Sequence, residues 1–178
     1  MLIVPGLHGS GTGHWQYWWQ RDHADARLVL QADWSRPDET KWIAVLEQAI
    51  LARPGSLIVA HSLGAILVAK LAGSRVASMI AGALLVAPAD INRTSSLHRR
   101  TYEFGTMPEA ALPFPSLVVA SQNDPYMPVA KLGGLAAQWG SRWHDLGSVG
   151  HINIESGFGR WTGGYNLAAE VIPQYQLH

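Results

Sequence analysis

The stretch 56–72 constrains the fold more than any other part of this chain. Its first half, 57–60, is a short apolar run that follows Pro54 and Gly55, as is typical of a strand buried on both faces. Its second half is apolar almost throughout, with Lys70 as its single charge, which favours a helix covered on both sides. The sequence therefore predicts that a buried strand turns directly into a buried helix.

A serine stands at that turn. The sequence Ala60-His61-Ser62-Leu63-Gly64 has the small-x-Ser-x-small pattern of a nucleophile elbow, with Ala60 where a glycine usually opens the motif. Small residues are needed at both ends because the sharp turn brings the strand and helix backbones together, and the serine hydroxyl is left exposed. The pattern leaves one alternative open, which is that Ser62 only caps the N-terminus of a helix.

Composition narrows the class of protein. The chain of 178 residues has 13 basic and 13 acidic residues and no long basic cluster, so nucleic acid and anionic membranes are not expected partners. It has no cysteine, which excludes disulfides, zinc–thiolate sites and a thiol nucleophile. The first apolar run ends at Pro5 without a preceding basic region, so we expect a cytoplasmic protein without a signal peptide.

Apolar runs of strand length alternate with helical patterns along the chain. This alternation predicts one α/β domain over 1–178, with about six parallel strands and helices on both faces. The segment 88–115 is the only long excursion near the predicted site, and it must cross the sheet and supply a helix, which leaves little or no cap. The expected strands are 2–4, 28–31, 57–60, 83–87, 116–120 and 142–146, and the expected helices are 14–21, 37–52, 63–72, 129–139 and 165–175.

Three residues follow strands whose carboxyl ends form the expected ligand-binding edge. Ser62 follows the third strand, Asp124 the fifth and His151 the sixth, which is the chain order of an α/β-hydrolase triad. A serine hydroxyl needs a base, histidine is suited to that role by an ordinary pKa near 6.5, and a carboxylate orients the imidazole. Asp90, after the fourth strand, is the competing acid, with helix capping as its alternative role.

The oxyanion of a tetrahedral intermediate also needs backbone donors. Leu63 N–H lies in the first turn of the elbow helix, where donors are free. The second donor is expected in the loop after the first strand, where Leu7 N–H is the first candidate and His8 N–H the second. His8, Trp15 and His61 are candidate pocket residues, although the helical spacing of Trp15 with two further tryptophans also favours core packing.

Four motifs resemble those of a known family, the small serine hydrolases of the retinoblastoma-binding-protein-9/YdeN type. The resemblance runs almost end to end and implies a compact α/β-hydrolase with little or no cap. It also implies that Ser62 is the nucleophile, Asp124 the acid and His151 the base. The motifs are Pro5-Gly-Leu-His-Gly-Ser-Gly-Thr-Gly-His-Trp15, Ala60-His-Ser-Leu-Gly64, Ala120-Ser-Gln-Asn-Asp-Pro125 and Gly150-His-Ile-Asn153.

The sequence therefore predicts a serine hydrolase that uses no metal and no cofactor. We expect a carboxylesterase whose partner is a small-molecule ester of a short acyl group and whose reaction passes through an acyl-enzyme. The sequence leaves two other interpretations open. The first is dinucleotide binding, because Gly9-x-Gly11-x-Gly13, with Asp33 about twenty residues on, resembles a dinucleotide-binding fingerprint, but its third glycine is misplaced. A protein-binding or scaffold protein with weak or incidental hydrolase activity is the stronger alternative.

Overall fold

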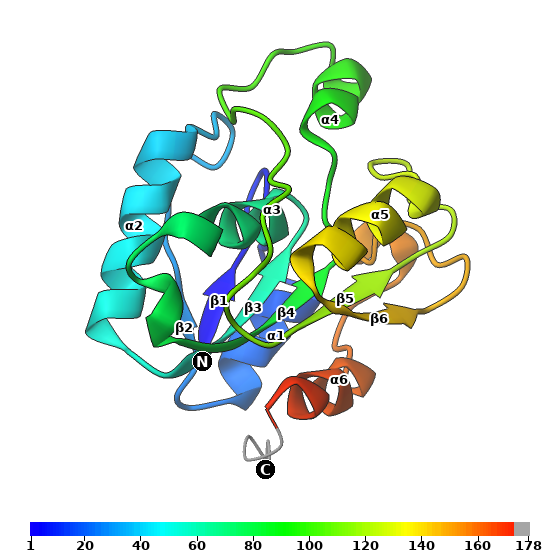
Figure 1. The fold of residues 1–178 in the computed structure, drawn as a ribbon. Coiled ribbons are helices and arrows are strands. Elements are labelled where there is room, and N and C mark those ends of the chain that lie inside the picture. Colours follow the sequence, from blue (N-terminus) through cyan, green and yellow to red (C-terminus); the bar gives the residue numbers. More distant parts are fainter. Residues whose placement is uncertain (173–178) are drawn as a thin grey trace.

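The computed structural model describes residues 1–172, and their strands form one parallel sheet. The sheet has six strands in the order β2-β1-β3-β4-β5-β6, and every neighbouring pair is parallel (Figure 1). The predicted parallel sheet is thus confirmed. The strands are β1 (Leu2–Val4), β2 (Arg27–Leu28), β3 (Ser56–His61), β4 (Ile80–Val86), β5 (Ser116–Ala120) and β6 (Arg142–Asp145).

Helices cover both faces of this sheet, as the sequence predicts. Helices α2, α3 and α5 pack on one face, whereas α1 and α6 pack on the other. Strand β3 shows why, because Ile58 and Ala60 point to the first layer and Leu57 and Val59 to the second. The helices are α1 (Trp15–Asp22), α2 (Glu39–Ala52), α3 (Leu63–Ala69), α4 (Ile91–His98), α5 (Val129–Trp139) and α6 (Gly163–Val171).

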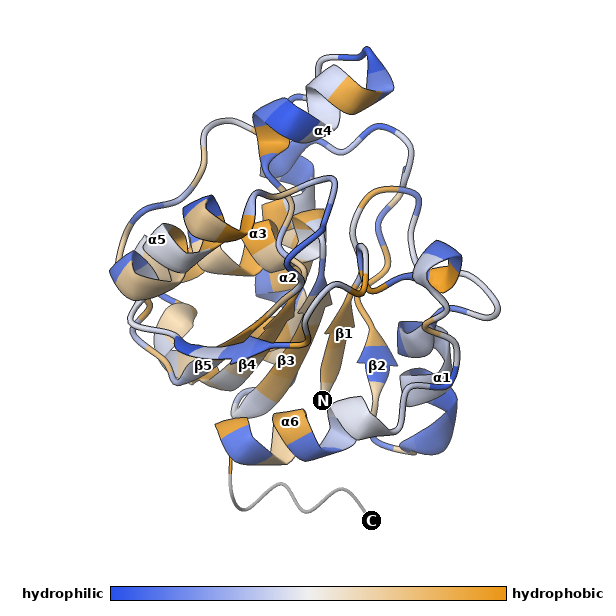
Figure 2. Cartoon of the chain, turned by 90° about the vertical axis from the view of Figure 1, so that its right-hand side faces the viewer, coloured by the Kyte–Doolittle hydropathy of each residue, from blue (hydrophilic) through white to orange (hydrophobic). Residues whose placement is uncertain are grey.

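Apolar residues gather where the layers meet. Figure 2 shows hydrophobic residues concentrated in the central strands, while the outer surfaces of the helices carry hydrophilic residues. The central strand β3 is buried along its whole length, which is the pattern expected of a parallel strand covered on both faces. None of the helices in the described part of the chain combines the length and the hydropathy that a membrane-spanning segment requires.

Several boundaries differ from the sequence-based expectation. The second strand was expected at 28–31 but is only Arg27–Leu28, because the chain leaves the sheet edge and Leu30 is 66% exposed. The helix expected at 63–72 is α-helical only to Ala69 and ends in a 3-10 turn. The last helix ends at Val171, and the expected continuation over 173–175 lies outside the described residues.

Helix α4 stands apart from the two helical layers. Figure 1 shows it beyond the carboxyl ends of the strands, after which the chain returns to β5 through an irregular segment that runs over α2 and α3. Glu39 N–H donates to Glu103 C=O at 2.9 Å and the Phe104 ring packs against Trp42, so this return segment is tied to α2. The segment 88–115 thus supplies one short helix over the site, and the predicted compact fold with little cap is confirmed.

Candidate active site

The predicted elbow is present between β3 and α3. Ser62 has φ 58° and ψ −126°, a conformation that non-glycine residues rarely adopt. Its N–H donates to Val86 C=O at 3.1 Å, which fixes the turn to β4. A Cβ on Gly64 would collide with the carbonyl groups of Val4 and Pro5, so α3 approaches β1 closely only because this position is a glycine.

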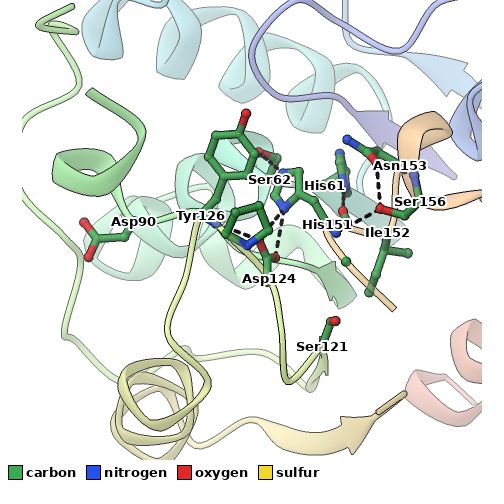
Figure 3. A network of polar contacts seen from close by, with 12 residues as sticks. His61, Ser62, Asp90, Ser121, Asp124, Tyr126, His151, Ile152, Asn153 and Ser156 are labelled. Atoms are coloured by element: carbon green, nitrogen blue, oxygen red, sulfur yellow. Dashed lines mark hydrogen bonds and ion pairs between the residues drawn. The ribbon is translucent and has the colours of Figure 1, made fainter. Parts of the chain in front are cut away.

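The three predicted site residues form one hydrogen-bonded chain (Figure 3). Ser62 Oγ lies 2.9 Å from His151 Nε2, and His151 Nδ1 lies 2.8 Å and 3.0 Å from the two Asp124 carboxylate oxygens. A carboxylate only accepts, so Nδ1 carries the proton of the neutral ring and Nε2 accepts from Ser62 O–H. All three side chains are buried, with the serine hydroxyl at the floor of a pocket.

The turn that follows β5 holds the Asp124 carboxylate in place. Tyr126 N–H donates to Asp124 Oδ1 at 2.8 Å, which closes a tight turn around Pro125. The Tyr126 ring packs on the His151 imidazole, with 4.4 Å between ring centroids. The same short segment therefore directs the carboxylate to one edge of His151 and covers one face of its ring.

The loop that carries His151 is fixed by contacts that the sequence analysis did not predict. His151 N–H donates to Ser156 Oγ at 3.0 Å, and Ser156 O–H donates to Asn153 Oδ1 at 2.9 Å. Trp15 Nε1–H donates to Ile152 C=O at 2.9 Å. The Gly150-His-Ile-Asn153 motif contained the signal for Asn153, but no sequence pattern pairs Trp15 with a carbonyl 137 residues away.

Two further histidines, His61 and His14, line the pocket close to His151. His61 Nε2–H donates to His151 C=O at 2.9 Å, so the elbow strand also holds the histidine loop. Burial, then the neighbouring His151 and His14, lower the pKa of His61 well below its ordinary value. Burial and His151 lower the pKa of His14 to about 4, and its Nδ1 accepts from Gln16 N–H at 3.1 Å. Both rings are therefore neutral at pH 7.

Two backbone donors next to Ser62 are free. Among the described residues, neither Leu63 N–H nor Leu7 N–H donates a hydrogen bond, whereas His8 N–H donates to Trp34 C=O at 2.9 Å. A Cβ on Gly6 would lie 2.9 Å from Leu63 N, so the missing side chain keeps that donor open. The geometry thus leaves Leu7 and Leu63 as the available pair and removes His8 N–H from the choice.

The competing acid, Asp90, has other partners. Its Oδ1 accepts from Asn92 N–H at 2.9 Å, which caps α4, and its other oxygen forms an ion pair with Lys131. Figure 3 shows its carboxylate pointing away from His151. Its backbone N–H nevertheless donates to Tyr126 C=O at 3.0 Å, so Asp90 supports the acid loop through the main chain alone.

A pocket of about 380 Å³ opens above Ser62. Five of the eight histidines line it, and α4 contributes Thr94 and His98 to its wall. Two larger hollows, of about 590 and 600 Å³, contain none of the three hydrogen-bonded residues. Of the candidate pocket residues, His8 and His61 line the pocket, whereas Trp15 is fully buried and lies outside its lining. The pocket-lining histidines are His8, His14, His61, His98 and His151.

Comparison with known proteins supports a serine hydrolase. The model of a family described as serine hydrolase matches residues 1–170. A putative YdeN-like hydrolase from Pectobacterium atrosepticum is 32% identical over 96% of this chain and 89% of its own, with a TM-score of 0.82. The ydeN gene product of Bacillus subtilis is 20% identical over 97% of each chain, with a TM-score of 0.76.

A more distant structure shares the fold alone. The carboxylesterase of Bacillus cereus is 15% identical over 94% of this chain and 87% of its own, with a TM-score of 0.57. No curated protein sequence matches this chain. Together with the sheet and its helical layers, these structures place the chain in a compact α/β-hydrolase fold.

Proposed function

Since the chain belongs to the serine hydrolase family, we propose that it is a carboxylesterase that cleaves esters of small acyl groups. The observation that carries the proposal is the unbroken chain from Ser62 O–H through His151 to the Asp124 carboxylate, with contacts of 2.8 to 3.0 Å. This is the arrangement that activates a serine hydroxyl. The groups involved all belong to the chain, so the proposed reaction needs no metal and no cofactor.

The first half of the reaction forms an acyl-enzyme. Ser62 Oγ attacks the ester carbonyl while His151 Nε2 takes its proton, and Asp124 stabilises the imidazolium that forms. The carbonyl oxygen becomes an oxyanion, which Leu63 N–H and Leu7 N–H would receive at the start of α3 and in the loop after β1. Collapse of the intermediate expels the alcohol, which leaves with the proton from His151.

The second half releases the acid. A water molecule gives its proton to His151 Nε2 and attacks the acyl carbon, and the same two N–H groups hold the second oxyanion. The proton returns to Ser62 Oγ as the ester bond to the serine breaks. The positive φ of Ser62 keeps its oxygen turned toward the pocket throughout, so both attacks occur at one place.

The size of the pocket sets the expected substrate class. Its volume of about 380 Å³ is near the lower end for small-molecule sites, and α4 is the one α-helix among the described residues that contributes to its lining. Each buried methylene contributes about 0.8 kcal/mol, or roughly fourfold in kcat/KM, only while the pocket still has room. We therefore expect kcat/KM to rise over short acyl chains and to stop rising well before twelve carbons.

The test combines a covalent probe with a substrate series. A fluorophosphonate should label the wild-type protein once, and Ser62→Ala should abolish both the labelling and the hydrolysis of p-nitrophenyl esters. Ser78→Ala changes an exposed serine outside the pocket and serves as the matched control. Labelling that survives in Ser62→Ala would contradict the assigned nucleophile.

The substrate series separates the proposal from its main alternative. A scaffold protein with weak or incidental activity would be labelled weakly or not at all and would hydrolyse esters of every chain length slowly. A steady rise in kcat/KM out to twelve or more carbons would instead contradict the small acyl pocket while leaving the hydrolase chemistry intact.

A further inference from the structure

A second hydrogen-bonded chain crosses the wall of the pocket. His98, in the last turn of α4, lies 2.9 Å through Nδ1 from the Tyr102 hydroxyl and 3.0 Å through Nε2 from the Tyr126 hydroxyl. The proposed ester hydrolysis makes no use of this chain. It nevertheless joins the helix over the site to the tyrosine that packs on His151.

His98, the histidine in this hydrogen-bonded chain, is neutral. Burial, and then the nearby His8, lower the pKa of His98 from its ordinary value. A neutral imidazole has one nitrogen that donates and one that accepts. One of the two tyrosine hydroxyls must therefore donate its proton to His98, and the other accepts from His98 and keeps its own proton for a different partner.

The surroundings of the two hydroxyls decide which tyrosine keeps its proton. Tyr102 is only 8% exposed, and His98 is the one hydrogen-bond partner of its hydroxyl among the described residues. The Tyr102 hydroxyl has no other acceptor among the described residues, so it donates to His98 Nδ1, whereas the Tyr126 hydroxyl faces the pocket and can meet an acceptor there. His98 Nε2–H thus donates to the Tyr126 oxygen, and Tyr126 O–H is free.

The free hydroxyl belongs to the pocket. Tyr126 lines the cavity above Ser62, whereas Tyr102 does not. Figure 3 shows the Tyr126 ring beside His151 with its hydroxyl pointing away from Asp124. Burial, then Glu155 and Asp124, raise the pKa of Tyr126, so the hydroxyl stays protonated and remains a donor.

We propose that Tyr126 O–H donates a hydrogen bond to a neutral oxygen of the substrate, so that esters bearing an ether, hydroxyl or carbonyl oxygen near the scissile bond are preferred. This inference rests on the proposed function, because it deepens the substrate class of the same pocket. Glu155 at the pocket mouth disfavours an anionic group, which is why the recognised oxygen is neutral.

Matched substrates isolate that contact. The acyl pair is p-nitrophenyl 3-methoxypropanoate and p-nitrophenyl pentanoate, which differ by an oxygen in place of one methylene. The alcohol pair is 2-methoxyethyl acetate and butyl acetate, followed by acid release. The oxygen also changes the intrinsic reactivity of each ester, but that factor cancels when the ratio of kcat/KM within a pair is compared between variants.

Three tyrosine variants test the relay. Tyr126→Phe keeps the ring on His151 and should lower the oxygen-to-methylene ratio about three- to tenfold in at least one pair, the range of one neutral hydrogen bond. Tyr102→Phe leaves His98 free to accept from Tyr126 and should lower the same ratio by a smaller factor. Tyr17→Phe, on the outer side of α1, should leave it unchanged.

Each result bears on one claim. A ratio that is the same in wild type and Tyr126→Phe for both pairs would overturn the recognition, and an unchanged ratio in Tyr102→Phe would overturn the relay. A second measurement, calorimetric binding of boronic acids, does not depend on ester turnover. We expect 2-methoxyethylboronic acid to bind the wild type more tightly than butylboronic acid. Absence of both ester turnover and boronate binding would overturn the proposed function. Ester turnover with equal oxygen-to-methylene ratios in wild type and Tyr126→Phe would overturn only the proposed contact of Tyr126 with the substrate.

Discussion

Two loops of this protein begin alike and end differently. Asp90 follows β4 and Asp124 follows β5, so both acids leave neighbouring strands at the same edge of the sheet. Asp124 accepts from His151 at 2.8 Å, whereas Asp90 caps α4 and pairs with Lys131. The two loops also contact each other, because Asp90 N–H donates to Tyr126 C=O at 3.0 Å.

The residues that follow each acid account for its role. Asp124 is followed by Pro125 and a tight turn, so its carboxylate stays beside the strand ends. Asp90 is followed at once by a helix, whose free N–H groups attract the carboxylate at Oδ1. In this chain, the strand-end acid that orients the histidine is the one that no helix follows directly.

The largest test of this comparison is Asp124→Asn. The amide oxygen and nitrogen fill the same space, so the fold should persist, but an amide no longer fixes the His151 tautomer or stabilises its charge. By analogy with the serine protease triad, kcat for ester hydrolysis should fall by up to about 10⁴-fold. Steady-state kinetics with p-nitrophenyl acetate would measure it, with circular dichroism as the check on folding.

The neighbouring acid supplies the control for that experiment. If Asp90 cannot replace Asp124, then Asp90→Asn added to Asp124→Asn should cause no further loss of kcat. Near-normal turnover in Asp124→Asn, lost again in the double variant, would mean that Asp90 can replace Asp124 as the acid that orients His151.

Much of the site was predictable because its parts are local. The elbow pattern around Ser62 lies between a buried strand and a buried helix, and such a turn needs only its own small residues. Parallel topology then brings the residues that follow neighbouring strands to one edge, which is why Asp124 and His151 could be placed beside each other from sequence. The same argument places Asp90 at that edge, with helix capping as its alternative role.

The rest depends on contacts between distant segments. The hydrogen bond from Trp15 to Ile152 and the one from His61 to His151 join residues 137 and 90 positions apart. The position of α4 likewise depends on the contacts that the segment 88–115 makes with the rest of the fold, and the composition of this segment does not reveal them. The short second strand was misplaced because an apolar run at a sheet edge lacks the neighbour that would extend its pairing.

The same contrast exists between two histidines. His151 faces a carboxylate, but His14 is buried without one, and its pKa is lowered to about 4. In the unfolded chain it is about 6.5, so the unfolded state binds more protons between these values. The contribution of neutral His14 to the free energy of unfolding is complete above pH 6.5 and is lost as the pH falls toward 4. The loss is about 2 kcal/mol at pH 5.

His14→Asn provides the matched variant. Asparagine retains a side-chain oxygen to cap α1 but does not titrate. Chemical denaturation at pH 7 and pH 5 should therefore show a smaller loss of unfolding free energy in His14→Asn than in the wild type, by about 2 kcal/mol. Equal losses in the two proteins would contradict a neutral, buried His14.

The smallest effect is expected at Asp90. Asp90→Ala removes both the cap of α4 and the partner of Lys131, and the lost cap should lower the unfolding free energy by about 1 kcal/mol. Asp90→Asn keeps a capping oxygen and loses only an ion pair whose lysine is 42% exposed, so it should cost less than Asp90→Ala. Because the backbone bond from Asp90 to Tyr126 survives in both variants, kcat should stay within about twofold of wild type. Thermal denaturation and ester kinetics on the pair would measure both quantities, and a collapse of kcat in either folded variant would show that the Asp90 carboxylate acts at the site.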